Sequence, residues 1–560
     1  MPGVALGIVA DGETTIRGLG VTNVEDPLPV TEHAVFPIAS ISKTFAATAM
    51  MRLVEQGKVE LRAPVRKYLP DFRVRDEAAS RDVTVWHLLT HLGGWEGQVS
   101  GPERGTDTLR NFMATTLPDL MQVAPPGKAW SYNNAGFSIA GRVIEVVTGT
   151  SINQAIRDLV FRPLGLEHAG TTPGEFIVQR FASGHTTRDG KTLLQRPFSP
   201  STSVTAGGVG LCITDLLAYA RFHMGDGTAA NGERVLARAS LEQMRTVQAH
   251  KQGTDDDIGL AWHIRQVGPI RTFGHGGTLG GHILLLELVP QRNFVIAILT
   301  NSNTGWRLIQ DVEREALKSY LGATYALNQA VAHRGLVETL PSVQPLVPQP
   351  DVAPYLGTYT RPSNSYLVRA DGGTLFVQDR SNGGGAGRES PVAFYGPDRL
   401  VVTDGPDRGQ SIEFVRDDAG RVNWIRVVGR VAVRSATTQS AAAAVPGPEQ
   451  LVGTWRGTST CTDRVAAPAC QDENVVYEFT AGPKPGMVHW AADKIVNGQR
   501  ERMGEFDVTY DTAEACWKAE FSSPRVKSVW RLTVDGARMS GTGRLLPGNE
   551  TIRTLELRKE

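Results

Sequence analysis

Two breaks in composition constrain the fold of this 560-residue chain more than any other feature of its sequence. Residues 341–354 hold five prolines with polar spacers, which is typical of an extended connector. Residues 435–449 are small and low in complexity, as flexible linkers are. We therefore predict three units, over residues 1–340, 351–434 and 450–560. Their sizes agree with a prior of roughly 150 residues for one domain.

The first unit mixes two hydrophobic periods. Apolar residues recur at helical spacing over residues 42–56 and 134–147, which predicts two helices. Patterns typical of strands, including a hairpin around Asp11-Gly12, occupy residues 4–9, 14–18, 282–289 and 293–300. The unit is therefore predicted to be α+β with an antiparallel sheet.

The second and third units show no long helical period. Short alternating runs separated by Asp-Gly, Gly-Pro and Asn-Gly turns predict small antiparallel β-barrels. Leu356-Gly357-Thr358-Tyr359 and Val452-Gly453-Thr454-Trp455 open the two units alike, which indicates a distant repeat. The predicted strands are residues 366–369, 374–378, 399–403, 411–416 and 422–427, then 475–479, 487–491, 504–510, 528–534 and 538–544.

Charge and hydropathy exclude two classes of partner. Lys plus Arg and Asp plus Glu both number 58, so no net positive charge attracts nucleic acid or anionic lipid. The most apolar run, residues 283–299, contains Glu287, Gln291 and Arg292, and no run reaches the 18 or so apolar residues of a membrane helix. We predict no transmembrane segment and no nucleic-acid partner.

The four cysteines indicate neither a metal site nor a cofactor. Cys212 stands alone, and the other three occur without a C-x-x-C motif or a nearby histidine pair, so we expect no metal and no cofactor. Cys461 and Cys470 flank an eight-residue polar loop. They either form a disulfide, which would favour an oxidising compartment, or remain free thiols.

Ser40-Ile41-Ser42-Lys43 is the first motif whose residues could take part in catalysis. Nucleophile elbows, zinc helices and phosphate-binding glycine loops are missing from the sequence, but this Ser-x-x-Lys stands where an apolar segment meets a helix start. One helical turn places Lys43 beside Ser40, and a desolvated lysine loses its proton more readily. The free N–H groups of the helix start can stabilise an oxyanion. By itself, however, one such motif is expected by chance in a chain of this size.

Two further groups accompany this motif. Tyr132 and Asn134 precede the second predicted helix, where a tyrosine can relay protons and an asparagine can bind an amide. The alternative is that an asparagine here only caps the helix. Residues 274–281 contain His275 and five glycines before a strand, which indicates close backbone approach and a place for an extended substrate. The alternative there is a flexible hairpin.

In the order Ser40-x-x-Lys43, Tyr132-x-Asn134 and His275-x-Gly277, the chain resembles the penicillin-recognising serine hydrolases of the class C β-lactamase-like branch. That branch includes D,D-peptidases, D-aminopeptidases and carboxylesterases. The resemblance implies a β-lactamase/transpeptidase-like catalytic domain, an antiparallel sheet flanked by helices, followed by two lipocalin-like β-barrels. It also rests on residues 2–5, 83–91, 126–127, 163–166, 206–211 and 259–262.

The resemblance also implies an acyl-enzyme mechanism and a role for each matching residue. Ser40 is the implied nucleophile, and Lys43 and Tyr132 are the implied proton-transfer pair. Asn134 is the implied substrate-amide contact. The backbone N–H groups of Ser40 and Thr278 form the implied oxyanion hole, with Gly277 beside them as a further substrate contact. His275 stands where β-lactamases usually have lysine, which argues against efficient β-lactam hydrolysis.

We therefore expect a serine hydrolase acting on small molecules or short peptides, with D-amino-acid peptides or amides preferred. The alternatives are a carboxylesterase, a weak β-lactamase, or a non-catalytic penicillin-binding scaffold. The two β units resemble the layout of D-aminopeptidases, in which a loop of the last barrel narrows the active site. Relatives usually have a helix before Pro2, so the start resembles a truncated one. A periplasmic or secreted protein is expected if a signal peptide precedes it, and a cytoplasmic one otherwise. The sequence leaves the oligomeric state open.

Overall fold

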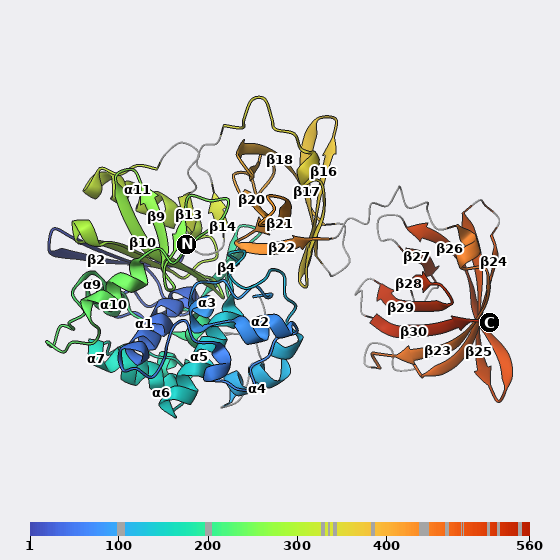
Figure 1. Ribbon diagram of the computed structural model, residues 1–560, viewed down its shortest axis with the longest axis horizontal. Helices are drawn as coiled ribbons and strands as arrows, with labels where there is room; N and C mark the ends of the chain where they lie inside the picture. Colours follow the sequence, from blue (N-terminus) through green and yellow to red (C-terminus); the bar gives the residue numbers. More distant parts are fainter. Residues whose placement is uncertain are drawn as a thin grey trace. The chain divides into compact units, whose positions relative to one another are not determined.

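The structure is a computed structural model with two compact units, Met1–Ala436 and Thr437–Glu560 (Figure 1). Both units contain closed β-barrels, and the first also holds a large mixed domain of helices and one sheet. Among the described residues, no helix is long and apolar enough to span a bilayer. The structure describes residues 1–97, 107–195, 204–325, 331–333, 337–339, 344–381, 387–435, 447–464, 470–482, 484, 486–511, 516–522, 527–546 and 551–560.

An eight-stranded antiparallel sheet forms the centre of the first unit. Its strands follow the order β2-β1-β12-β11-β10-β9-β8-β7. The hairpin predicted around Asp11-Gly12 is confirmed, with Val9 opposite Thr14, and β11 and β12 fall within one residue of their predicted bounds. The strands are β1 Gly3–Ala10, β2 Glu13–Gly20, β7 Ala249–His250, β8 Asp257–Ile258, β9 His263–Val267, β10 Ile270–Leu279, β11 His282–Val289 and β12 Phe294–Thr300.

Helices cover both faces of this sheet, and alternate residues of the central strands point to opposite layers. In β11, Leu284 and Leu286 pack with the helices α1, α5 and α9, whereas Ile283 and Leu285 pack with α11. Figure 1 shows α11 on one side of the sheet and the other three helices on the opposite side. Because both faces are buried, residues 283–299 read as one apolar run although they form a hairpin.

The two longest predicted helices are confirmed, as α1 Ser42–Glu55 and α5 Asn134–Thr148. The 3-10 turn Ala39–Ile41 precedes α1, and the short strands β3 Phe36–Pro37 and β6 Gly210–Leu211 pair beside it. The remaining helices are α2 Glu77–Asp82, α3 Val85–Leu89, α4 Thr108–Thr115, α6 Ile152–Ile156, α7 Arg162–Leu164, α8 Pro173–Ile177, α9 Ile213–Met224, α10 Arg238–Arg245 and α11 Trp306–Leu321. Two small hairpins are β4 His185–Arg188 with β5 Lys191–Leu194, and β13 Val331–His333 with β14 Val337–Thr339.

A closed eight-stranded antiparallel barrel completes the first unit. It closes where its first strand pairs with its last, at Thr360 opposite Val433. The sequence predicts five of the eight strands and misses β15, β18 and β22. The strands are β15 Gly357–Arg361, β16 Asn364–Asp371, β17 Thr374–Ser381, β18 Glu389–Gly396, β19 Arg399–Val402, β20 Ser411–Arg416, β21 Val422–Val427 and β22 Arg430–Arg434.

The second unit is another closed barrel of eight antiparallel strands. Five are predicted, and the sequence misses β23, β27 and β30. The repeat seen at the start of each barrel has a structural counterpart. Tyr359 Oη donates to the Tyr355 carbonyl at 2.8 Å, and Trp455 Nε1 donates to the Leu451 carbonyl at 2.7 Å, each four residues back. The strands are β23 Gly453–Cys461, β24 Glu473–Ala481, β25 Met487–Val496, β26 Gln499–Asp511, β27 Cys516–Ser522, β28 Lys527–Asp535, β29 Arg538–Leu546 and β30 Thr551–Lys559.

Of the two alternatives for the paired cysteines, the structure has the disulfide. Cys461, the last residue of β23, bonds to Cys470, and their Cα atoms lie 5.9 Å apart. Cys212 and Cys516 are buried and take no part in this disulfide.

Candidate active site

Ser40 lies on a turn at the start of a helix. The turn Ala39–Ile41 leads directly into α1, and Ala39 has a φ of 47°, in the left-handed region that residues with a side chain rarely adopt. One helical turn on, Lys43 Nζ donates a hydrogen bond of 3.2 Å to Ser40 Oγ. The two residues of the Ser-x-x-Lys motif are thus in direct contact.

The amine of Lys43 is fully buried, and among the described residues no carboxylate forms an ion pair with it. Its Nζ also donates to the Ala206 carbonyl at 2.6 Å and lies 4.9 Å from the ring centre of Tyr132. Burial and, second, the positive charge of Arg430 lower the pKa of Lys43 well below its usual value. This environment favours the neutral amine, the form that can accept a proton from a serine hydroxyl.

Tyr132 and Asn134 lie on the segment that enters α5, but the helix cap is the residue between them. The Asn133 side chain accepts a hydrogen bond of 2.8 Å from the Gly136 N–H and donates one of 2.9 Å to the Trp95 carbonyl. The side-chain Oδ1 of Asn134 is buried and has no hydrogen-bond partner among the described residues. Asn133 therefore performs the capping role, and the Asn134 amide remains available to a ligand.

Three histidine rings surround the buried side chain of Tyr132. The centres of the His91, His275 and His263 rings lie 4.4, 6.1 and 6.5 Å from the centre of the tyrosine ring. Burial raises the pKa of the Tyr132 hydroxyl, and an interaction with the Ser40 hydroxyl opposes this rise. Tyr132 is accordingly a neutral phenol at physiological pH, suited to donate a proton.

His91 holds the Tyr132 segment in place. Its ring stacks on Tyr132, its Nδ1 accepts a hydrogen bond of 2.9 Å from the Asn133 N–H, and its carbonyl accepts one of 3.1 Å from the Ser131 N–H. Burial and, next, the charge of Lys43 lower the pKa of His91 well below its usual value. The imidazole is therefore neutral, with its proton on Nε2 because Nδ1 accepts.

The strand β10 carries the glycine-rich segment with His275, Gly277 and Thr278, and it pairs with a neighbouring strand on only one side along this stretch. Its pairing with β9 ends at Gly274, whereas its pairing with β11 continues to Leu279. On this stretch His275 is buried, and its Nδ1 lies 2.6 Å from the Gly276 carbonyl oxygen. A carbonyl oxygen only accepts, so Nδ1 of His275 carries a proton. Thr278, near the end of the strand, is exposed.

Gly277 brings this strand against the Ser40 turn. A Cβ atom at Gly277 would lie 2.5 Å from the Ile38 carbonyl oxygen and 3.2 Å from Ala39 Cβ. Only glycine permits this separation, so the predicted close backbone approach is confirmed. Residues 274–279 belong to β10, and Gly280 and Gly281 form the turn of the antiparallel hairpin that β10 makes with β11, so these residues do lie in a hairpin, as the alternative expected.

A hairpin of the first barrel docks on the same site. Its two turn residues, Val428 and Gly429 between β21 and β22, have φ angles of 52° and 70°, a conformation that a β-branched residue seldom adopts. The Gly429 carbonyl accepts a hydrogen bond of 2.8 Å from the Tyr132 N–H, and Ser131 Oγ accepts one of 3.2 Å from the Val431 N–H. Contacts with the tyrosine segment hold this strained turn in place.

The hairpin places the guanidinium of Arg430 5.5 Å from the ring centre of Tyr132. Arg430 is only 6% exposed, and among the described residues no acceptor hydrogen-bonds its Nε and no carboxylate forms an ion pair with it. Burial, more than the opposing effects of Tyr132 and Glu96, lowers the pKa of Arg430 to about 10. The charge of Arg361 acts in the same direction as burial, so the barrel contributes two neighbouring cations.

Of the seven residues that the sequence singled out, the structure links five by direct contacts or close approach, namely Ser40, Lys43, Tyr132, His275 and Gly277. Asn134 and Thr278 lie on the same segments as Tyr132 and Gly277. Ser40 and Lys43 come from the α1 turn, Tyr132 and Asn134 from the entry to α5, and the remaining three from β10. These last three are His275, Gly277 and Thr278.

Sequence reasoning assigned no role to three other residues at the site, His91, His263 and Arg430. His91 lies within a segment that carried the family resemblance, which could have pointed to it. The sequence contains no comparable local signal for Arg430. Among the described residues, the one group of three His, Cys, Asp or Glu side chains close enough to hold a metal ion is His33, His168 and Cys212, which includes none of the residues above.

Comparisons with known proteins agree on one family. Residues 1–318 match the family model described as Beta-lactamase. Penicillin-binding protein 4 of Amycolatopsis lactamdurans is 33% identical over 372 residues, which are 64% of this chain and 93% of that protein. Esterase EstB of Burkholderia gladioli is 37% identical over 181 residues, 30% of this chain and 45% of the esterase. The crystal structure of SurE with D-Leu matches with a TM-score of 0.62 and 27% identity, covering 77% of this chain and 95% of that chain.

Proposed function

Because the chain belongs to the Beta-lactamase family of serine hydrolases, we propose that it hydrolyses short peptides or amides containing a D-amino acid through an acyl-enzyme on Ser40. The observation that carries the proposal is the buried contact of 3.2 Å between Lys43 Nζ and Ser40 Oγ, beneath the ring of Tyr132. Few arrangements other than nucleophilic catalysis need an unpaired lysine buried against a serine.

Acylation uses Lys43 as the base. Ser40 Oγ attacks the substrate carbonyl carbon, and its proton passes to the neutral Lys43 amine. The carbonyl oxygen becomes an oxyanion, which the N–H groups of Ser40 and Thr278 stabilise. Tyr132 donates its proton to the leaving nitrogen, regains one from the Lys43 ammonium, and the C–N bond breaks. A water then attacks the ester, and its proton returns through Lys43 to Ser40.

The two pKa directions support this division of roles. Burial lowers the pKa of Lys43 and raises that of Tyr132, so at neutral pH the amine is the proton acceptor and the phenol is the proton donor. The reverse assignment would require a phenolate in a site where burial disfavours it.

Two observations support a D-amino-acid substrate with an anionic or polar group. SurE, whose solved structure contains D-Leu, shares 27% identity over 77% of this chain. Arg430 lies beside Tyr132 with its Nε unpaired, and Arg361 has buried Nε and Nη1 atoms without a partner among the described residues. These guanidinium groups suit a substrate carboxylate, because planar donors bind carboxylates in pairs.

The nucleophile is tested with Ser40→Ala. Removing the hydroxyl should lower kcat/KM for an activated p-nitrophenyl ester by about 10^4-fold or more, because no bond to the acyl group can form. Intact mass measured after brief exposure should show an acyl adduct in the wild type and none in the variant. Ser319→Ala, an exposed serine on α11, is the matched control and should behave as the wild type. Undiminished turnover by Ser40→Ala would refute the nucleophile assignment.

Substrate class is tested with paired compounds. Turnover of D-alanyl and L-alanyl p-nitroanilides should favour the D-isomer, and a D-residue peptide with a free carboxylate should exceed its amide counterpart. If both isomers react at equal rates and the wild type still forms an acyl adduct, the serine hydrolase assignment holds but the D-amino-acid preference is rejected.

A carboxylesterase is the second candidate, since Esterase EstB shares 37% identity over 181 residues. High kcat/KM on simple esters and none on either anilide would favour it. Weak β-lactamase activity would appear as turnover of a cephalosporin, against which His275 in the usual lysine position argues. A non-catalytic scaffold would give no adduct with any probe.

A further inference from the structure

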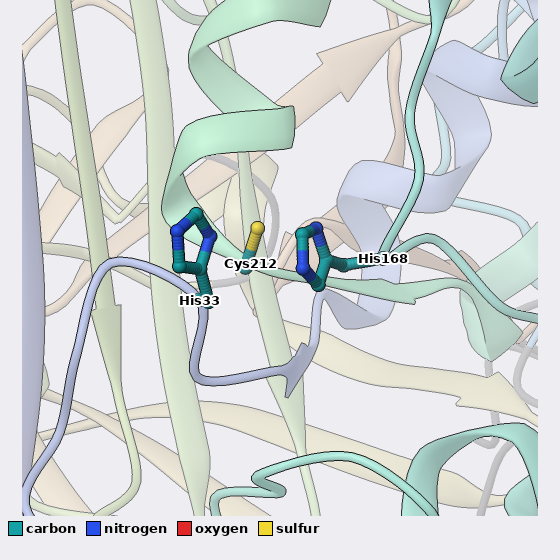
Figure 2. Close-up of side chains that lie close together, drawn as sticks. All are labelled: His33, His168 and Cys212. Carbon is teal, nitrogen blue, oxygen red and sulfur yellow. The ribbon is translucent and has the colours of Figure 1, made fainter.

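A group of potential metal ligands lies outside the residues of the proposed reaction. His33, His168 and Cys212 come from three separate segments, and each offers one ligand atom within 4.8 Å of the others. Figure 2 shows the side chains of Cys212, His33 and His168 close together, with Cys212 at the point where the chain enters α9. The mechanism proposed above uses none of these three side chains.

The backbone holds each member of the group in place. His33 stands three residues before β3, and Cys212 follows β6 directly, while Phe36 of β3 pairs with Leu211 of β6. The His168 N–H donates a hydrogen bond of 2.8 Å to the Asp215 carboxylate in the first turn of α9. Regular elements therefore bring together residues that are up to 179 positions apart in the chain.

The donor set is that of a zinc site. One thiolate and two imidazoles are preferred ligands of Zn²⁺, with Zn–S near 2.3 Å and Zn–N near 2.0–2.1 Å, which in a tetrahedron separates the donors by about 3.3–3.6 Å. The two rings now stack 4.8 Å apart at 16°, so their in-plane lone pairs run nearly parallel. One ring must turn, and the His33 side chain, 54% exposed, has the room to do so.

We propose that this group binds a Zn²⁺ ion through the Cys212 thiolate and the His33 and His168 imidazoles, with water in the fourth position. The thiol releases its proton to solvent when its sulfur binds the ion, as metal-bound thiols do. Asp215, whose Oδ1 lies 3.7 Å from His168 Nδ1, orients that ring, as carboxylates orient many metal-bound histidines. The ion would tie the segment leading into the Ser40 turn to the start of α9, as a structural clamp.

Co²⁺ provides the test, because a thiolate bound to it gives a near-ultraviolet charge-transfer band. The full-length protein, freed of metal with a chelator, should develop this band with one equivalent of Co²⁺ and lose it on addition of Zn²⁺. Cys212→Ser should abolish the band, and His33→Ala should weaken the affinity by more than about tenfold. Cys516→Ser, at the other buried cysteine outside the disulfide, is the control and should bind as the wild type does. Zn²⁺ should raise Tm in the wild type and the control but not in Cys212→Ser.

The site is rejected if the wild type gives no band, or if His33→Ala binds Co²⁺ as tightly as the wild type. A band that persists in Cys212→Ser would place the metal on other residues. Should Cys212→Ser misfold, His33→Ala decides, since it removes an exposed side chain. Acylation of Ser40 by the activated ester confirms that each variant is folded, so loss of metal and loss of the hydrolase are separate outcomes.

Discussion

Lys43 and Arg430 are two basic side chains that share one buried environment without carboxylate ion-pair partners among the described residues. Such an arrangement is costly for stability, because burial disfavours each charge and each disfavours the other. Burial and, second, the charge of Arg430 lower the pKa of Lys43, whereas Arg430 is protonated at neutral pH with a pKa lowered to about 10. Arg430 therefore contributes to the reactivity of Lys43 from a different domain of the same unit.

Arg430→Gln should shift the pH dependence of the reaction. Lys43 acts as a base when neutral, so kcat/KM falls as pH drops through its pKa. Removing the nearby positive charge raises that pKa, which moves the acid limb of the profile to higher pH. A displacement of about one pH unit corresponds to a tenfold lower kcat/KM on that limb.

Arg430→Lys keeps the positive charge and is the matched control, with an acid limb close to that of the wild type. The measurement is kcat/KM for an uncharged activated ester between pH 5 and 9, about the range where the protein is expected to stay folded. An unchanged limb in Arg430→Gln, or one displaced to lower pH, would contradict the electrostatic role of Arg430.

At the scale of elements, the site depends on how closely β10 passes the turn before α1. The strand edge beyond Gly274 has no β9 partner, and Gly277 lets its backbone lie against the Ile38 carbonyl. This approach places the backbone of Gly277, the residue before Thr278, against the turn that carries Ser40. The spacing between two elements, more than any single side chain, therefore sets the geometry of the proposed oxyanion hole.

Gly277→Ala should disrupt this spacing. The added methyl would lie 2.5 Å from a backbone oxygen, so the strand or the turn must move. We expect kcat/KM to fall about 10^2-fold, the typical effect of a misplacement near 1 Å, with a stability loss of about 1–3 kcal/mol. Gly174→Ala, in α8 with open space around its Cβ, should leave both quantities nearly unchanged. Kinetics and thermal unfolding check the pair, and wild-type kcat/KM in Gly277→Ala would show that the close approach is dispensable.

Across the first unit, the barrel of β15–β22 packs against the domain that carries the proposed site. Trp424 Nε1 donates a hydrogen bond of 2.7 Å to the Val123 carbonyl, and both residues belong to an apolar cluster that joins the barrel to the helical domain. A buried ion pair between Arg426 and Glu413 lies beside this cluster, and Arg426 also binds the Gln252 carbonyl. The barrel thus shapes one side of the site through its β21–β22 hairpin.

Truncation separates the contributions of the two barrels. A fragment of residues 1–436, the first compact unit, should fold and retain acylation of Ser40 by the activated ester. A fragment of residues 1–350 loses Arg430 and the hairpin and exposes Val123 and Ala129, so we expect at least about a tenfold lower kcat/KM and a tendency to aggregate. Gel filtration, thermal unfolding and ester kinetics measure the difference. Full activity in the shorter fragment would show that the first barrel is not needed for the reaction at Ser40.

The sequence alone determined the features that depend on neighbours along the chain. A helical period predicted α1 and α5, because a buried helix face repeats with the geometry of the helix. Continuous apolar runs rich in β-forming residues predicted β11 and β12. The Ser-x-x-Lys spacing likewise predicted contact between its two residues, since one helical turn fixes their separation.

Only the tertiary structure decided which remote segments meet. Closure of each barrel pairs its first strand with its last, β15 with β22 and β23 with β30. These strands alternate weakly in sequence, and the hydrogen bonds of the closed sheet stabilise them. The docking of Arg430 on Tyr132, 298 residues away, and the approach of His33 to His168 and Cys212 leave no periodic trace. Such contacts depend on how the whole unit packs. They cannot be predicted from the local pattern of residues, because the packing energy comes from segments that are distant in the chain.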